Sequence, residues 1–134
     1  ERHAMVGIRG YEGPEFEALP EERGLHVSTG PEVHDRGIEP CIRAAIDHAT
    51  DGVDHVYLTV DIDGVDPAYA PGTGTPEPGG LTSADLLRAM DLLGEVSEIG
   101  AMDLMEVAPN LDPTDQTQRL AANAIVRFLE AKFL

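Results

Sequence analysis

The sequence has 134 residues, 42% of them hydrophobic, so it is long enough for one domain with a buried core and too apolar for global disorder. Its 25 acidic residues outnumber 9 Lys and Arg, and the net charge of −16 argues against nucleic acids and anionic membranes as partners, since both attract basic clusters. No apolar run approaches the roughly 20 residues of a membrane span, and residues 1–8 lack a signal-peptide pattern, so we expect a cytoplasmic protein.

The first part of the chain predicts two short strands and one helix. Residues 5–8 form a short apolar run typical of a buried strand, and residues 25–27 predict a second strand. Between them, residues 11–23 are acidic and contain proline and glycine, which predicts a loop or a short exposed helix. Apolar residues recur at helical spacing across residues 38–49. Cys41 lies on that stripe, which favours a small core residue over a nucleophile.

Two further strands are predicted around a long loop. Residues 56–60 have the nearly unbroken apolar character of a central parallel strand, and residues 99–107 predict another buried strand. Residues 66–80 contain four prolines and four glycines, a composition that predicts a long, stiff loop without regular structure. Such loops are usually functional. A helix is predicted to follow Thr82 as its cap and to stop at Gly94.

A last helix is predicted to open at Asp112-Pro113. The residues expected on its inner face are Leu120, Ala121, Ala124, Ile125, Phe128 and Leu129. Strands and helices alternate along the whole chain without repeats or a linker. This alternation predicts the α/β class, with a mostly parallel sheet in a single domain.

Acidic residues end two of the predicted strands, at the sheet edge where α/β proteins bind ligands. Asp61 and Asp63 follow the strand at residues 56–60, and Glu106 lies near the end of the later one. Side chains at i and i+2 of an extended segment point the same way, so the two aspartates converge and need a cation or a shared proton. Oxygen ligands of this kind suit Mg²⁺ or Mn²⁺. The alternative is a turn cap, which is the favoured interpretation of Asp66.

Asp-x-Asp-Gly after a strand also occurs in other kinds of site. A calcium loop of the EF-hand type that starts at Asp61 would close at Gly72, where an acidic residue is required. Phosphatases of the haloacid dehalogenase type carry the motif near the start of their domain and use a downstream lysine. The single lysine here, Lys132, falls in the last predicted helix, where an exposed side chain is expected. The Gly-Thr-Gly-Thr segment lacks the Gly-Lys-Ser/Thr ending of a phosphate-binding P-loop.

The residues after the motif are more specific. Residues 61–82 read Asp-Ile-Asp-Gly-Val-Asp-Pro-Ala-Tyr-Ala-Pro-Gly-Thr-Gly-Thr-Pro-Glu-Pro-Gly-Gly-Leu-Thr, which closely resembles the second signature of the ureohydrolase family of arginases, agmatinases and relatives. Residues 6–10, 105–109 and 121–123 are also similar to segments of that family. The Pro-Gly-Thr-Gly-Thr-Pro form of the loop resembles agmatinases more than arginases, which tend to have alanine at the position of Gly72.

The resemblance implies an arginase-like, three-layer α/β/α fold with a mostly parallel sheet, of which residues 1–134 are the C-terminal half of a single domain. It implies that Asp61 bridges two Mn²⁺ ions and that Asp63 binds one of them. Glu106 would hold the substrate's guanidinium through paired hydrogen bonds, and Thr75 would contact the substrate from the loop. The implied reaction is the hydrolysis of agmatine to putrescine and urea, with hydroxide generated from water by the two metals.

The same resemblance indicates that part of the site is missing. The family's other metal ligands come from an Asp-x-His-x-Asp cluster and an earlier histidine, and the sequence contains no such cluster. No histidine matches a family ligand position; the five are His3, His26, His34, His48 and His55. We therefore expect no complete catalytic site, and no activity, from this chain alone. An open sheet edge predicts pairing within a homo-oligomer or with a complementary N-terminal half.

Alternatives to agmatine hydrolysis stay open from the sequence. The small-molecule substrate could be guanidinobutyrate or another guanidino compound. A non-catalytic oligomerisation or regulatory module would keep the signature by descent, and release of urea on mixing with an N-terminal half separates it from an enzyme. A phosphatase-like hydrolase would release phosphate by itself and lose that activity in Asp61→Asn.

Overall fold

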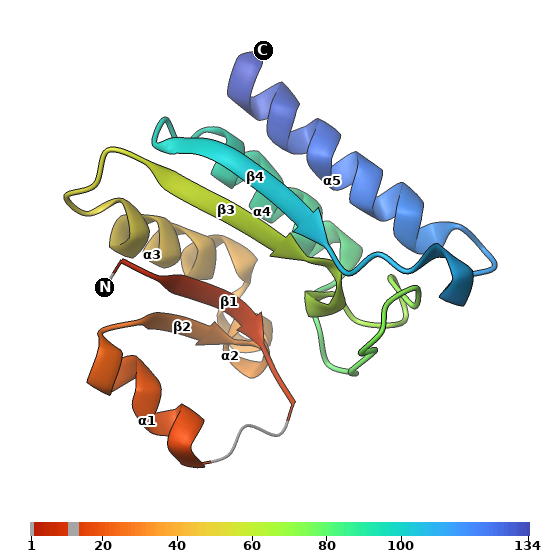
Figure 1. Ribbon diagram of the computed structural model, residues 1–134, viewed down its shortest axis with the longest axis horizontal. Coiled ribbons are helices and arrows are strands. Elements are labelled where there is room, and N and C mark those ends of the chain that lie inside the picture. Colours follow the sequence, from red (N-terminus) through yellow and green to blue (C-terminus); the bar gives the residue numbers. More distant parts are fainter. Residues whose placement is uncertain (1, 11–13) are drawn as a thin grey trace.

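The computed structural model describes residues 2–10 and 14–134 (Figure 1). The elements in chain order are β1 (Ala4–Ile8), α1 (Pro14–Arg23), β2 (His26–Thr29), α2 (Gly30–Arg36), α3 (Ile38–Thr50), β3 (Val56–Asp61), the 3-10 helix η1 (Ile62–Gly64), α4 (Ser83–Gly94), β4 (Ile99–Met105), the 3-10 helix η2 (Pro109–Leu111) and α5 (Gln116–Phe133). The strands form two parallel pairs, β1 with β2 and β3 with β4, and their arrows all point the same way (Figure 1). The predicted α/β class with parallel strands is confirmed.

The first strand pair is short and contains an irregularity at Gly7. Met5 lies opposite Val27, and the register shifts between Val6 and Ile8. Gly7 has a φ of +86°, a conformation that glycine adopts without the strain that a side chain would cause. Both predicted strands are therefore present, with β2 placed slightly later than residues 25–27.

The acidic segment after β1 contains a helix. Of the predicted range 11–23, residues 11–13 lie outside the described part, and residues 14–23 form α1, so the helical alternative is confirmed for them. Pro14 starts α1, where its missing N–H has no helical partner to lose. The helix lies beyond β2, on the side away from β3 (Figure 1).

A short helix, α2, was not expected from apolar periodicity. Its signal is local: the Thr29 side chain accepts a hydrogen bond from the Glu32 N–H, and the Glu32 side chain accepts one from the Thr29 N–H. This reciprocal capping box, with a proline in the first turn, starts a helix without a long apolar stripe. Seven residues later the chain breaks at Gly37 and begins α3.

Helix α3 is amphipathic, as its apolar spacing predicts. Cys41 is fully buried on it, so the interpretation of this cysteine as a core residue is confirmed. The helix packs against β1, β2 and α4. Because it also connects β2 to β3 along the chain, it joins the two strand pairs.

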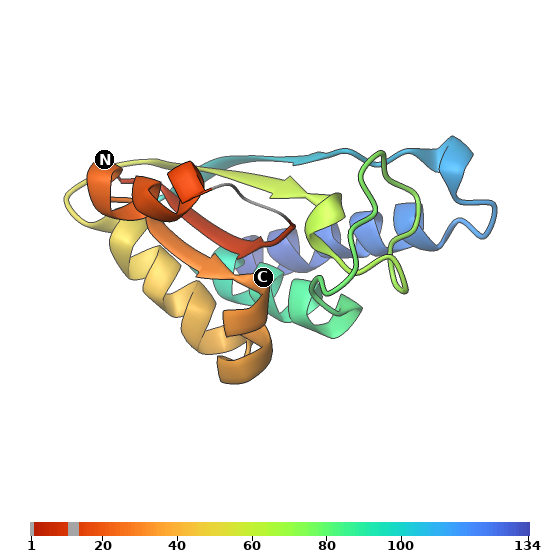
Figure 2. The ribbon, with the colours of Figure 1, turned by 90° about the horizontal axis from the view of Figure 1, so that it is seen from below.

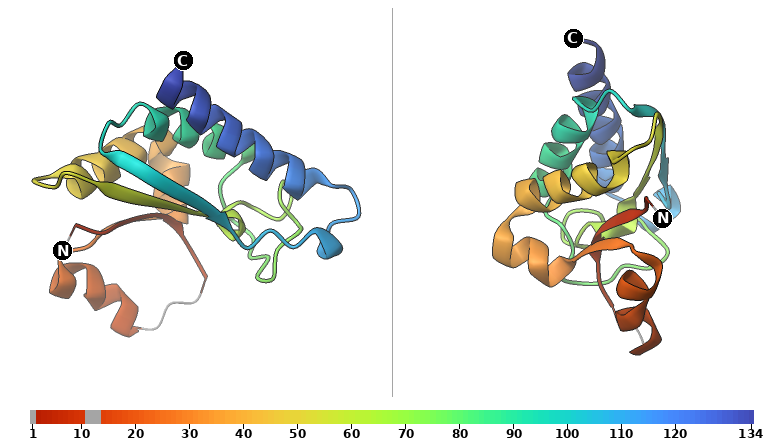
Figure 3. Two further views of the ribbon diagram at one scale, coloured as in Figure 1. Left: turned by 45° about the horizontal axis from the view of Figure 1, so that its top comes forward. Right: turned by 90° about the vertical axis from the view of Figure 1, so that its left-hand side faces the viewer.

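The helices α3, α4 and α5 lie on one face of the strands (Figure 2). Helices α4 and α5 pack along each other (Figure 3), and Arg127 of α5 forms an ion pair with Asp91 of α4. The opposite face of the β3–β4 pair is more open, since Tyr57 is 63% exposed and Met105 is 48% exposed. The predicted burial of residues 56–60 therefore holds for the helical face of β3 alone.

The last two predicted elements have shifted ends. Strand β4 ends at Met105, before residue 107, because Glu106 has a φ of +64° and leaves the extended conformation. Helix α5 begins at Gln116, later than Asp112-Pro113, because Asp112 forms a turn with Thr114 and Thr117. Four of the six predicted inner-face residues are buried, whereas Ile125 and Leu129 are 37% and 44% exposed.

None of the helices in the described residues is both long and apolar enough to cross a membrane.

Candidate metal and substrate site

Asp61 and Asp63 lie together at the carboxyl end of β3. Asp61 is the last residue of the strand, and the chain then turns into η1, which contains Asp63. The Asp63 N–H donates to Asp61 Oδ1 over 3.0 Å. Ile62, between them, is fully buried and anchors the turn in the core. The two carboxylates meet because a 3-10 turn replaces the extended conformation assumed from the sequence.

The electrostatics around Asp61 fit a bound cation. Burial raises the pKa of Asp61 above its usual range, the Asp63 N–H lowers it in part, and the nearby charges of Asp63 and Glu106 raise it further. Three carboxylates thus repel one another at this edge, and a cation would relieve that repulsion. Hard oxygen donors of this kind suit Mn²⁺ or Mg²⁺, so the residues present fit one side of such a metal site.

Thr75 brings the long loop against Asp63. Its hydroxyl donates a hydrogen bond to Asp63 Oδ2, twelve residues earlier in the chain. Residues 66–80 contain no helix or strand, as predicted, yet Thr75 holds them against Asp63. The structure therefore places Asp61, Asp63 and Thr75, three of the four site residues expected from the sequence, in one cluster.

Asp66 and Arg9 hold the loop in place. Asp66 accepts hydrogen bonds from the N–H groups of Ala68, at 2.9 Å, and Gly79, at 2.7 Å, which lowers the pKa of its carboxyl and confirms its interpretation as a turn cap. Arg9 donates to the carbonyl of Glu77 from Nε at 3.0 Å and from Nη2 at 2.7 Å, and to the carbonyl of Asp63. Sequence reasoning missed Arg9, although its position directly after a strand, at the ligand edge, was a signal.

The middle of the loop is fixed to the start of α5. The Gly72 N–H donates to Thr117 Oγ1 over 2.8 Å, and Thr117 donates in turn to the buried Asp112. A Cβ on Gly72 would lie 2.7 Å from Asp112 Cβ and 2.9 Å from Thr117 Oγ1, so a larger residue would require these two side chains to shift. Thr117 and Asp112 are supporting residues that no motif in the sequence indicated.

Glu106 lies next to this cluster in a strained conformation. Its neighbour Met105 is the register partner of Asp61, so the two strand ends bring Glu106 beside the aspartates. The φ of +64° is unusual for a residue with a side chain and is found most often where function requires it. Glu106 is exposed, and its carboxylate is available to a ligand.

The described residues do not form a complete metal site. Across residues 2–10 and 14–134, no group of three or more His, Cys, Asp or Glu side chains is arranged to hold a metal ion. Three histidines are engaged in other contacts: His26 bonds Ser28 and lies 5.9 Å from the ring of His48, and His34 lies 3.1 Å from the carbonyl of Gly79.

Lys132 differs from its prediction as an exposed side chain. It is half-buried, and its ammonium donates to the carbonyl of Val96, just before the amino end of β4. Asp61 lies at the opposite, carboxyl end of the sheet. A phosphatase-like mechanism that requires a lysine beside the aspartate is therefore not supported by the position of Lys132.

The chain is similar to known proteins in both sequence and structure. A family model described as "Arginase family" matches residues 1–130. An agmatinase of Chromobacterium violaceum is 47% identical over 100 residues, which cover 75% of this chain and 30% of that protein. A formimidoylglutamase of Halalkalibacterium halodurans is 35% identical over 133 residues, 98% of this chain and 42% of that protein.

The solved structure of the arginase from Bacillus caldovelox has the same fold. It superposes with a TM-score of 0.87 at 31% identity, covering 98% of this chain and 44% of that one. This likeness confirms the predicted arginase-like α/β architecture. The chain spans less than half the length of the curated relatives it matches.

Proposed function

Because the chain belongs to the arginase family, we propose that it contributes one side of a metal-dependent hydrolase site that cleaves a C–N bond of a guanidino substrate. The main supporting observation is the cluster of Asp61, Asp63 and Glu106 at the carboxyl edge of the sheet. There like charges lie close together, next to a loop that a hydrogen bond fixes to Asp63. Agmatine is the first candidate substrate, since the agmatinase relative is 47% identical and the loop has the agmatinase-like Pro-Gly-Thr-Gly-Thr-Pro form.

Each residue has a chemical role in this proposal. Asp61 and Asp63 would hold the metal ions, and when bound, two Mn²⁺ would lower the pKa of water and so supply the nucleophile near neutral pH. Glu106 accepts paired hydrogen bonds from the planar, permanently charged guanidinium and orients its carbon. Thr75, fixed against Asp63, closes the site from the loop side. The remaining ligands come from sequence outside these 134 residues.

The relatives differ in the substrate they act on, so the identity of the substrate beyond its guanidino group is a separate question. The curated proteins similar to this chain include a formimidoylglutamase as well as an agmatinase. The substrates that these two names imply each contain a C–N bond at an amidine-type carbon. This is the part of the substrate that Glu106 and the aspartates would face. Guanidinobutyrate therefore remains an alternative substrate of the same site.

The first test is calorimetric titration of the chain with Mn²⁺. We expect weak binding, with a Kd on the order of 1 mM, that disappears in the Asp61→Asn/Asp63→Asn double variant. The control is Asp35→Asn/Asp47→Asn, which changes two exposed aspartates and the net charge by the same amount. Equal binding by all three proteins would contradict the proposal and favour a non-catalytic module.

The second test measures catalysis in an assembled enzyme. The chain is refolded with the part of the Chromobacterium violaceum agmatinase that precedes the counterpart of residues 1–134, and urea release from agmatine is assayed with Mn²⁺. We expect activity from the mixture and none from either part alone, with Glu106→Gln lowering kcat/KM at least tenfold. Retention of full activity in Glu106→Gln would remove the guanidinium role from this residue.

A further inference from the structure

Both backbone polar groups of Gly72, in the long loop, are hydrogen-bonded to other segments. Its N–H donates to Thr117 Oγ1 over 2.8 Å, and its carbonyl accepts from the Ala108 N–H over 2.7 Å. Thr117 lies in the first turn of α5, whereas Ala108 lies three residues after the end of β4. The loop and the chain that follows β4 lie next to each other beyond the end of the sheet (Figures 1 and 2). One loop residue is therefore bonded to two distant segments.

The hydroxyl that receives the Gly72 N–H is itself held by a carboxylate. Thr117 Oγ1 donates to Asp112 Oδ2 over 2.8 Å, and the same oxygen accepts from the Thr117 N–H over 2.7 Å. A hydroxyl has one proton, so with that proton directed at Asp112 its oxygen can only accept from Gly72. Gly72, Ala108, Asp112 and Thr117 together form what we call the Gly72 clamp.

The centre of the clamp is buried. Thr117 is fully buried, Asp112 is 1% exposed, and Gly72 is buried as well. Because these groups are removed from solvent, a lost bond leaves a polar group unpaired instead of hydrated. Thr75, three residues after Gly72, is exposed, so the clamp holds the loop just before its exposed part.

Glu106 lies two residues before Ala108, on the other side of the clamp. Its φ of +64° is a strained conformation for a residue with a side chain, and such a conformation persists where the surrounding structure holds it. The bond from the Ala108 N–H to Gly72 fixes the direction in which the chain leaves β4. The clamp therefore holds the strained end of the strand from the loop side.

We propose that Thr117 is a positioning residue that holds Glu106 in place for the substrate by way of Gly72. This role rests on the proposed function, because it concerns the same guanidino substrate. A planar guanidinium forms two hydrogen bonds only with a carboxylate that lies in its plane, so a small rotation of Glu106 would lose one of them. The same bonds fix the loop from which Thr75 reaches the site.

The candidate metal ligands are held by other contacts. Ile62, between Asp61 and Asp63, is fully buried in the core. Arg9 donates to the carbonyl of Asp63 from the first strand pair. Loss of the Thr117 hydroxyl should therefore weaken the binding of substrate and leave the binding of metal ions largely unchanged.

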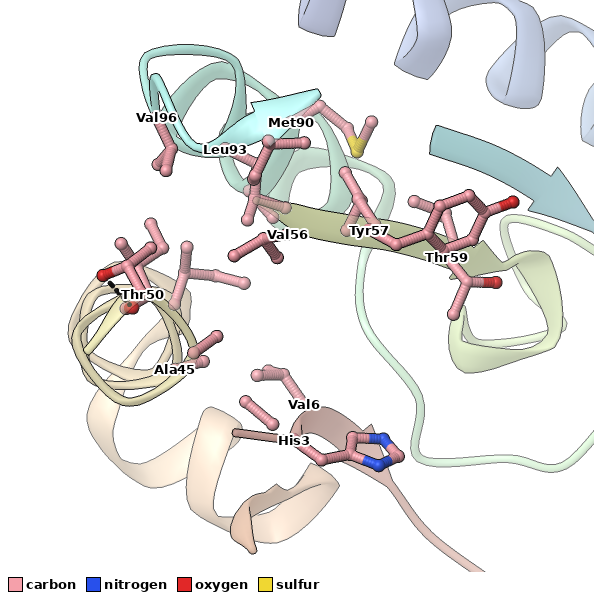
Figure 4. Close-up of a pocket in the computed structure, with 18 of the residues that line it drawn as sticks. His3, Val6, Ala45, Thr50, Val56, Tyr57, Thr59, Met90, Leu93 and Val96 are labelled. Carbon is pink, nitrogen blue, oxygen red and sulfur yellow. Dashed lines mark hydrogen bonds between the residues drawn. The ribbon is translucent and has the colours of Figure 1, made fainter. Parts of the chain in front are cut away.

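Thr50 offers a matched control. It is also a helical threonine whose hydroxyl donates a hydrogen bond, to the carbonyl of Ile46 over 2.9 Å (Figure 4). It lies in the wall of an apolar groove between β1 and β3, which Val6, Ala45 and Leu93 also line (Figure 4). Thr50→Val thus removes a comparable hydroxyl without touching the Gly72 clamp.

Kinetics of the assembled enzyme test the proposal. The assembly is formed with the part of the Chromobacterium violaceum agmatinase that precedes the counterpart of residues 1–134. We expect Thr117→Val to raise the KM for agmatine at least tenfold, and to change the Mn²⁺ concentration for half-maximal activity by less than about twofold. Thr117→Ser, which keeps the hydroxyl, and Thr50→Val should each stay within about twofold of the parent in KM.

Two kinetic results would overturn the proposal. One is a Thr117→Val enzyme that loses kcat in proportion to its folded fraction while its KM stays at the parent value, as a purely structural role requires. The other is an equal rise of KM in Thr117→Val and Thr50→Val.

Hydrogen exchange by mass spectrometry in the chain alone separates this inference from the proposed function. Thr117→Val should speed exchange at least tenfold in residues 72–75 and 106–108, and leave residues 4–8 unchanged within about twofold. This pattern, together with a parent assembly that releases no urea, would remove the proposed function while the positioning of Glu106 by the clamp would stand. Unchanged exchange in either segment would overturn the inference whatever the activity of the assembly.

Asp112→Asn covers the case in which Thr117→Val does not fold. It keeps the shape of the clamp and replaces a charged acceptor with a neutral one, so the bond from the Thr117 hydroxyl weakens without being removed. We expect the same pattern of faster exchange in residues 72–75 and 106–108, with smaller changes. Exchange in this variant that matches the parent in both segments would also overturn the proposal.

Discussion

Among single residues, Arg9 connects the first strand pair to the candidate site. Its guanidinium donates to backbone carbonyls of Asp63 and Val65 in and after η1 and of Glu77 in the loop. These acceptors are 54 to 68 residues away in sequence, so one side chain fixes the relative positions of three segments. A planar group with five donors is suited to this, whereas a lysine could not satisfy the same carbonyls together.

Replacing Arg9 with methionine should loosen the loop and lower the stability. The substitution keeps an unbranched side chain in place of the arginine's methylenes and removes its donors, leaving partly buried carbonyls without partners. We expect a loss of about 1–3 kcal/mol in the free energy of unfolding by urea and faster hydrogen exchange in residues 71–80. Arg43→Met removes an exposed ion pair with Glu39 and should cost less than about 1 kcal/mol. Equal effects of the two substitutions would contradict the role of Arg9.

The buried carboxylate of Asp112 should make the folded chain less stable in acid. Hydrogen bonds from Thr114 and from the N–H and hydroxyl of Thr117 hold the pKa of its carboxyl well below the usual range. A depressed pKa means that the unfolded chain binds the proton more tightly than the folded one. The stabilisation is therefore complete above the unfolded pKa of about 4 and is lost as the pH falls below it.

The Asp112→Asn variant tests this linkage by urea denaturation at several pH values. At pH 7 it should be less stable than the parent chain, and the difference should shrink steadily between pH 5 and pH 2. Asp35→Asn, on an exposed aspartate, serves as the control. A difference that stays constant over this range would show that the Asp112 interactions do not depend on its charge.

At the scale of elements, α4 and α5 approach each other closely at Gly94. A Cβ at this position would lie 2.6 Å from the carbonyl oxygen of Phe128 and 2.7 Å from Ala131 Cβ. The first of these atoms belongs to the backbone of α5, so the contact is relieved only if the two helices move apart. The Arg127–Asp91 ion pair and the buried Phe128 hold them together.

Gly94→Ala should therefore destabilise the chain even though alanine favours helix by up to about 1 kcal/mol over glycine. Overpacking of this kind costs about 1–3 kcal/mol, and the net effect should be a lower melting temperature. Gly100→Ala is the matched control, because a Cβ there meets no atom within 4 Å. A melting temperature for Gly94→Ala at or above that of the parent would show that the helices can separate without cost.

At the scale of the whole molecule, the net charge of −16 opposes the compact state. The ion pairs among the described residues involve largely exposed groups, which offset little of that repulsion. The Debye length falls from about 10 Å at 0.1 M salt to about 3 Å at 1 M, so added salt screens the repulsion. This is the behaviour expected of a protein adapted to high salt.

The melting temperature should accordingly rise as NaCl increases from 0.1 M to 1 M. A variant with Asp35→Asn, Asp47→Asn and Asp54→Asn, all at exposed positions, should show a smaller rise because it carries three fewer negative charges. Calorimetric scans of both proteins make the comparison. A melting temperature that fell with salt would exclude high-salt adaptation.

The sequence by itself determined the order and type of most elements and the position of the acids at the strand ends. Those features depend on local patterns: the apolar spacing of α3, the Thr82–Asp85 capping box of α4, and the proline and glycine content of residues 66–80. The family resemblance of residues 61–82 is local in the same sense. Even the missed helix α2 had a local signal in Thr29 and Glu32.

Only the tertiary structure decided which surfaces meet and which stay open. The bonds of Arg9 to Glu77, the close approach of Gly94 to Phe128 and the groove between β1 and β3 join residues far apart in sequence, and no periodicity encodes such contacts. The division of the strands into two pairs is decided in the same way, since each strand pairs with a partner that lies beyond an intervening helix. Local propensity fixes what each segment becomes, and long-range packing fixes what it touches.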